Sequence, residues 1–158
     1  MEFTHINEQG RARMVDVTDK NDSDRVAYAQ AVVCMQPETL KAIKEGAVKK
    51  GDVLAVAQTA GIMGAKKTPD VVPMCHPLML TGVDISFDFD EDKSTISVFA
   101  EVRTTGKTGV EMEAITAVSI AAITIYDMCK ATDRWMEITD IRLNEKIGGK
   151  SGHVKRDF

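Results

Sequence analysis

A run without a single charged side chain, Ala114 to Tyr126, limits the possible folds of this chain more than any other feature. It lies inside Thr108 to about Ala131, which we predict to be one long helix, with Thr108 and Glu111 forming a T-x-x-E capping box at its start. The run is shorter than the roughly 20 residues that a membrane-spanning helix needs. One sheet covers only one face of such a helix, so we infer that other copies of the chain cover the rest.

Strand patterns surround this helix. Val83 to Phe89 and Ile96 to Val102 alternate apolar and polar residues, and the turn Asp90 to Lys93 joins them into an antiparallel hairpin. We also predict strands at Arg25 to Met35, where a helix is the competing interpretation, and at Met136 to Ile147.

Two further helices are predicted before the hairpin. The first runs from Pro37 to Gly46, and the second begins after Asp52 and ends near Pro69, with glycines that permit close packing. The order strand, helix, strand, strand, helix, strand predicts an α+β, ferredoxin-like βαββαβ fold, with an antiparallel sheet and helices packed on one face.

We expect one domain over residues 1–158, with an N-terminal arm over 1–24 and a Gly/Lys tail over 148–158. The arm is predicted to hold one short strand near residues 14–17. The N-terminus lacks the charged and apolar regions of a signal peptide, so we expect the protein to be located in the cytoplasm.

Composition excludes several classes of protein. The net charge of -4 argues against wrapping nucleic acid, which requires excess Lys and Arg. The three cysteines, Cys34, Cys75 and Cys129, form no CxxC motif, so neither a disulfide framework nor a structural zinc site is indicated.

Two segments are similar to phosphate-binding loops, namely TTGKTG (104–109) and GGKSG (148–152). Neither has the glycine spacing of a true P-loop, but both remain candidate anion cradles, with a plain helix start and a flexible tail as the alternatives. Lysines and an arginine elsewhere in the chain are candidates to surround a polyphosphate. The candidates are Arg25, Lys49, Lys50, Lys66, Lys67, Lys107, Lys146 and Lys150.

Candidate acid–base residues stand at both ends of the long helix. Asp127 and Lys130 are three residues apart, and their apolar neighbours predict a buried pair whose pKa values are tuned toward neutrality. Glu113 lies 14 residues before Asp127, about 21 Å along a helix, so a pocket that uses both requires two subunits. In the loop PMCHP (73–77), His76 is a candidate ligand contact, and Cys75 is read more readily as a buried turn residue.

Several of these segments together resemble the MoaC family, the cyclic pyranopterin monophosphate synthases of molybdenum cofactor biosynthesis. The resemblance rests on TTGKTGVEMEA (104–114), TIYDMCKA (124–131), PMCHPL (73–78) and KGDV (50–53), with support from THIN (4–7), MVDV (14–17) and GGKSG (148–152). It implies a hexamer, a trimer of dimers, with active sites between subunits. It also implies a substrate made from GTP by a radical-SAM cyclase, namely cyclised dihydro-GTP, with pyrophosphate as the second product.

The resemblance also assigns residues to roles. It implies that Asp127, Lys130 and Lys50 are catalytic. Substrate-binding positions implied by it are Met74, Cys75, His76, Met112, Glu113, Lys66 and Arg25, and we add Lys107, Lys146 and Lys150 for the departing pyrophosphate. No cofactor or resident metal is expected, although magnesium can accompany the pyrophosphate.

Two other functions compete with this lyase. The phosphate-loop-like segments fit a nucleoside triphosphatase. A non-catalytic nucleotide-binding or RNA-binding module is the third candidate, but aromatic residues are only 5% of the chain and the polar face of the hairpin is acidic.

Overall fold

A computed structural model describes residues 6–157. The elements in chain order are β1 (Ser23–Cys34), α1 (Pro37–Lys44), α2 (Val53–Lys66), α3 (Thr68–Val71), β2 (Leu80–Asp90), β3 (Thr95–Gly106), α4 (Glu111–Cys129), β4 (Glu137–Ile147) and β5 (Val154–Lys155). Of the motif THIN, Thr4 and His5 lie outside the described residues.

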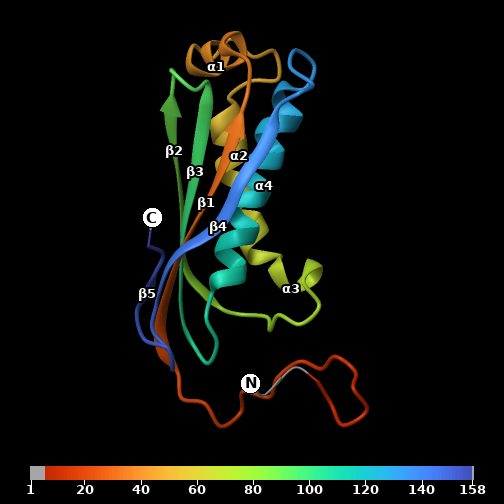
Figure 1. The fold of residues 1–158 in the computed structure, drawn as a ribbon, viewed down its shortest axis with the longest axis vertical. Helices are drawn as coiled ribbons and strands as arrows, with labels where there is room; N and C mark the ends of the chain where they lie inside the picture. The colour runs from red at the N-terminus through yellow and green to blue at the C-terminus, as the bar shows by residue number, and fades with distance from the viewer. Residues whose placement is uncertain (1–5, 158) are drawn as a thin grey trace.

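The strands form one antiparallel sheet in the order β2-β3-β1-β4-β5. The first four strands have the order of a ferredoxin-like fold, so the predicted α+β class and topology are confirmed. Figure 1 shows α2 and α4 lying along one face of this sheet, with α1 near one end of α4 and the N-terminal arm near the other. Both ends of α4 therefore lie near other segments of the chain.

The central strand β1 is buried through its small residues. Ala27, Ala29, Ala31 and Val33 are at most 1% exposed, whereas the bulkier alternate positions face the other side of the sheet. Alanines at the inward positions let α4 approach the sheet closely, and α4 contributes its own alanines to the same core.

The helix α4 is also covered by α2. A Cβ added at Gly61 of α2 would lie 3.0 Å from the carbonyl oxygen of Ala117 and 3.2 Å from the Cβ of Ala121, which confirms the predicted close packing. We expected other copies of the chain to cover every face of α4 that the sheet leaves open. This expectation is wrong for the face that α2 covers. Of the large apolar side chains on α4, Met112 and Ile123 remain exposed.

By length and hydropathy alone, α4 is able to cross a membrane, with a mean hydropathy of 1.4. Half of the apolar stretch within α4 is nevertheless buried inside the fold, between the sheet and α2. We interpret α4 as a core helix, because a core helix passes the same test.

The structure corrects three local expectations. The capping box at Thr108 does not form: α4 begins at Glu111 after Val110, and Glu111 pairs instead with Lys146 of β4 at 2.9 Å. No strand forms at residues 14–17. The tail is not free, because residues 154–155 pair with β4 as β5.

Candidate active site

Three candidate catalytic residues meet at the C-terminal end of α4. The carboxylate of Asp127 lies 2.7 Å from Lys130 Nζ and 3.0 Å from Lys50 Nζ, and Lys50 Nζ also donates to the backbone carbonyl of Asp127 at 2.7 Å. Lys130 follows Asp127 by three residues, whereas Lys50 comes from the loop before α2. The close packing of α2 on α4 brings that loop to the end of α4.

This cluster is more exposed than the apolar sequence around it predicted. The side chains of Asp127 and Lys130 are 53% and 52% exposed, because the buried face of this last turn belongs to Ile125, Met128 and Cys129. The expected shift toward neutrality is also wrong for the single chain. Hydrogen bonds from Lys130 and Lys50 lower the pKa of Asp127, and Asp127 raises the pKa of Lys130.

A hollow of about 540 Å³ adjoins the cluster. Besides Lys50 and Lys130 it is lined by Tyr126, Arg134 and Trp135, which the sequence analysis did not single out. The signal for Trp135 was available in principle: it is the single tryptophan of the chain, and it follows the TIYDMCKA motif by only a few residues.

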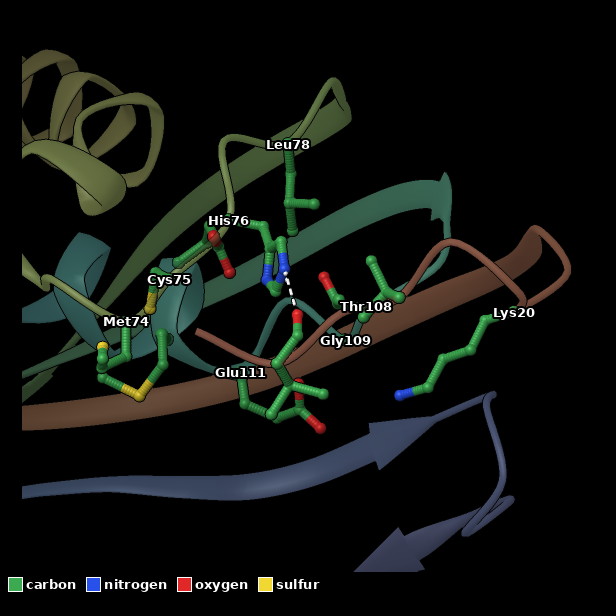
Figure 2. Close-up of a pocket in the computed structure, with 12 residues that line it drawn as sticks. Lys20, Met74, Cys75, His76, Leu78, Thr108, Gly109 and Glu111 are labelled. Carbon is green, nitrogen blue, oxygen red and sulfur yellow. Dashed lines mark hydrogen bonds between the residues drawn. The ribbon is translucent and has the colours of Figure 1, made fainter. Parts of the chain in front are cut away.

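A second cavity, of about 280 Å³, lies at the N-terminal end of α4. It collects the predicted residues Met74, Cys75 and His76 from the loop before β2, and Met112 and Glu113 from α4. Figure 2 shows Met74, Cys75, His76 and Leu78 beside Thr108, Gly109 and Glu111. These two segments are distant in the sequence, and the fold brings them to one cavity.

The N-terminal arm also lines this cavity. His76 Nε2 donates to the carbonyl oxygen of Val15 at 2.8 Å, and because a carbonyl only accepts, Nε2 carries the proton. Lys107 Nζ donates to the carbonyl of Thr18 at 2.6 Å, which ties the arm to the loop before α4. The arm thereby brings Val17 and Lys20 to the cavity, and neither was predicted as a site residue.

Glu113 is an acidic side chain in an unusual place, because it is only 3% exposed. Burial raises the pKa of its carboxyl, and the nearby negative charge of Glu111 raises it further. Within residues 6–157 no cation forms an ion pair with Glu113. Burial also raises the pKa of the neighbouring Cys75 thiol, which favours its neutral form.

Replacing Glu113 by glutamine is expected to raise the melting temperature at about pH 8 by a few degrees. The pKa of the folded carboxyl lies above its unfolded value, so the folded state binds the proton more tightly and stability falls as pH rises above about 4.5. The gain in melting temperature should shrink toward about pH 4, where the Glu113 carboxyl is protonated in both the folded and the unfolded state. Thermal unfolding across pH measures this, with Glu137→Gln as a control that removes one exposed carboxyl instead. A lower melting temperature at about pH 8 would contradict an unpaired buried carboxyl.

Some of the predicted basic residues form hydrogen bonds or ion pairs within the fold, and others are exposed to solvent. Arg25 donates from Nε to the carbonyl of Gly106 at 2.8 Å and from Nη2 to that of Lys107 at 3.1 Å. A Cβ at Gly149 would lie 2.2 Å from Arg25 Nη1, so both phosphate-loop-like segments meet at this guanidinium.

The other predicted basic residues lie at varying distances from the cavity. Lys146 reaches its rim through the pairing with Glu111. Lys150 is exposed on the turn of residues 148–152. Lys66 is exposed at the end of α2 and does not line the cavity, so the structure does not bring it together with the other candidates.

The two parts of the candidate site are separated by the length of α4. Glu113 and Asp127 belong to the same continuous helix, which places them about 21 Å apart. Among residues 6–157, no group of three or more His, Cys, Asp or Glu side chains is arranged to hold a metal ion.

Comparison with known proteins gives one consistent result. A sequence model of the MoaC family matches residues 14–149. A protein of Syntrophomonas wolfei is 71% identical over 157 residues, covering 99% of this chain and 100% of the relative. Proteins of Thermoanaerobacter sp. strain X514 and Brevibacillus brevis are each 60% identical, covering 99% and 98% of this chain and 99% and 96% of the relatives. All three relatives are named cyclic pyranopterin monophosphate synthase.

Proposed function

The chain belongs to the MoaC family, and from that premise we propose that it is an enzyme of molybdenum cofactor biosynthesis that forms cyclic pyranopterin monophosphate. The substrate we propose is cyclised dihydro-GTP, with pyrophosphate as the second product. The observation that carries the proposal is the 71% identity with a synthase over nearly the whole of both chains.

The reaction opens the imidazole ring of the purine, rebuilds it as a pterin and closes a cyclic phosphate, so its main requirement is positioned acids and bases. We assign this role to Asp127, Lys130 and Lys50. The pairing lowers the pKa of Asp127 and raises that of Lys130, so the carboxylate is ionised and the ammonium is protonated before the first step. Asp127 then begins as the proton acceptor and Lys130 as the proton donor, and Lys50 supports the carboxylate from its other side.

The cavity at the other end of α4 suits the nucleoside part of the substrate. Met74, Cys75 and Met112 offer apolar and weakly polar surface to a flat ring. Glu113 and His76 offer directional hydrogen bonds, and the proton on Nε2 of His76 leaves its Nδ1 free to accept one when the ring is neutral. We propose Arg25, Lys107, Lys146 and Lys150 as contacts of the departing pyrophosphate, while Lys66 is the least supported of the proposed contacts.

The separation along α4 supports an active site shared between subunits. One small substrate does not span about 21 Å, so the cavity of one copy has to meet the Asp127 cluster of another. The exposed apolar side chains Ile123, Val56 and Met63 on α4 and α2 are consistent with such contacts. We propose the hexamer, a trimer of dimers, as the assembly that provides them.

We further propose that the enzyme acts as one domain in the cytoplasm and receives its substrate from a radical-SAM GTP cyclase. It requires neither a resident cofactor nor a metal in this scheme, and magnesium enters only with the pyrophosphate.

Incubation with cyclised dihydro-GTP, followed by mass spectrometry of the products, tests the function. We expect one cyclic pyranopterin monophosphate and one pyrophosphate per substrate, with turnover that persists in EDTA. Phosphate release from GTP with magnesium, without any pterin product, would instead support the triphosphatase.

A further inference from the structure

The loop that follows α4 presents two exposed side chains beside the catalytic candidates. Arg134 is exposed and Trp135 is 87% exposed, and both line the hollow that Lys50 and Lys130 also line. Large exposed aromatic residues are uncommon on a surface without a binding role.

This loop is held in place, which distinguishes it from an ordinary surface turn. Asp133 is 5% exposed, and its carboxylate accepts from the backbone N–H of Gln36 at 2.8 Å and of Trp135 at 3.3 Å. Tyr126 donates its hydroxyl to the backbone carbonyl of Arg134 at 3.0 Å. These bonds fix the backbone of residues 133–135 and leave the side chains of Arg134 and Trp135 available.

The charges around the hollow are unbalanced. Lys50 and Lys130 share the single carboxylate of Asp127. Within the described part of the chain, no carboxylate forms an ion pair with Arg134. Even with the buried carboxylate of Asp133 counted, three cations stand against two carboxylates. This excess of positive charge attracts an anion with several charged oxygens, and a guanidinium binds phosphate through paired N–H donors.

We propose that Arg134 is a further phosphate-binding residue, which holds the phosphate chain of the substrate next to Lys50 and Lys130 while Trp135 forms a wall of the same site. The proposal rests on the proposed function for the identity of the ligand, but anion binding is measurable without turnover. It also explains why the backbone around Arg134 is fixed by a buried carboxylate.

Titration with inorganic pyrophosphate tests the proposal, followed by calorimetry and by the fluorescence of Trp135, the single tryptophan of the chain. We expect Arg134→Ala to weaken pyrophosphate binding about tenfold, and Arg134→Lys to recover part of the loss. The fold should persist, because Tyr126 contacts only the backbone carbonyl of residue 134. In turnover, KM for the substrate should rise about tenfold with little change in kcat.

The matched control is Arg156→Ala, which removes the same charge from a residue that directly follows β5 and does not line the hollow. It should leave pyrophosphate affinity unchanged. The proposal would be overturned by wild-type pyrophosphate affinity in Arg134→Ala, or by an equal loss of affinity in Arg156→Ala. It would also be overturned if the fluorescence of Trp135 did not change at saturating pyrophosphate. Dissociation of the oligomer in Arg134→Ala would overturn it as well, because it would make Arg134 an interface residue. If wild type makes no pterin product but the Arg134 dependence persists, only the proposed function fails.

Discussion

Replacing Asp127 by asparagine is expected to lower product formation by about 10²- to 10⁴-fold, the range that a positioned acid–base group contributes. Asparagine preserves the size of the side chain and can still accept a hydrogen bond, but it neither takes up a proton near neutral pH nor keeps Lys130 and Lys50 paired. The side chain is 53% exposed, so the fold should tolerate the change. Single-turnover assays with mass spectrometry measure the effect.

A matched control for this variant is Asp70→Asn, because Asp70 also pairs with a lysine three residues away, Lys67, at 3.2 Å and is similarly exposed. That variant should keep wild-type turnover. Adding Lys50→Ala to Asp127→Asn should cost little more than the single change, because residues that act as a unit are not additive. Turnover within about threefold of wild type in Asp127→Asn would show that the carboxylate has no catalytic role.

The fold was largely predictable because its strands carry local patterns. In the hairpin of β2 and β3, alternation alone located the strands and the acidic turn between them. The start of α4 was not predictable in this way. The T-x-x-E motif favoured Thr108 locally, but the ion pair of Glu111 with Lys146, 35 positions later in the chain, is a tertiary contact that no local pattern carries.

The site was predictable only in part, for a similar reason. Asp127 and Lys130 could be paired from their spacing on a helix, whereas Lys50 joined them through family resemblance alone, because it is 77 positions from Asp127. The apolar neighbours suggested burial, but they occupy the inner face of the same turn. Lys20 carries no periodic signal, and only the path of the arm brings it to the cavity.

Mixing two inactive variants is expected to restore activity if the active site is shared between subunits. Asp127→Asn damages one end of α4 and His76→Ala damages the cavity at the other end. A shared site that takes Asp127 from a His76→Ala copy and His76 from an Asp127→Asn copy is intact, and random assembly of equal amounts produces such sites in about a quarter of cases. Recovery of about a quarter of wild-type turnover, from two preparations with almost none, is therefore the expected result.

The matched control mixes Asp127→Asn with Lys130→Ala, which are damaged at the same end of α4. Asp127 and Lys130 contact each other within one chain at 2.7 Å, so every site built from this mixture has one damaged residue. It should remain inactive in every proportion. Rescue in the control would mean that the two residues serve different sites, and no rescue in the first mixture would mean that one subunit supplies both ends.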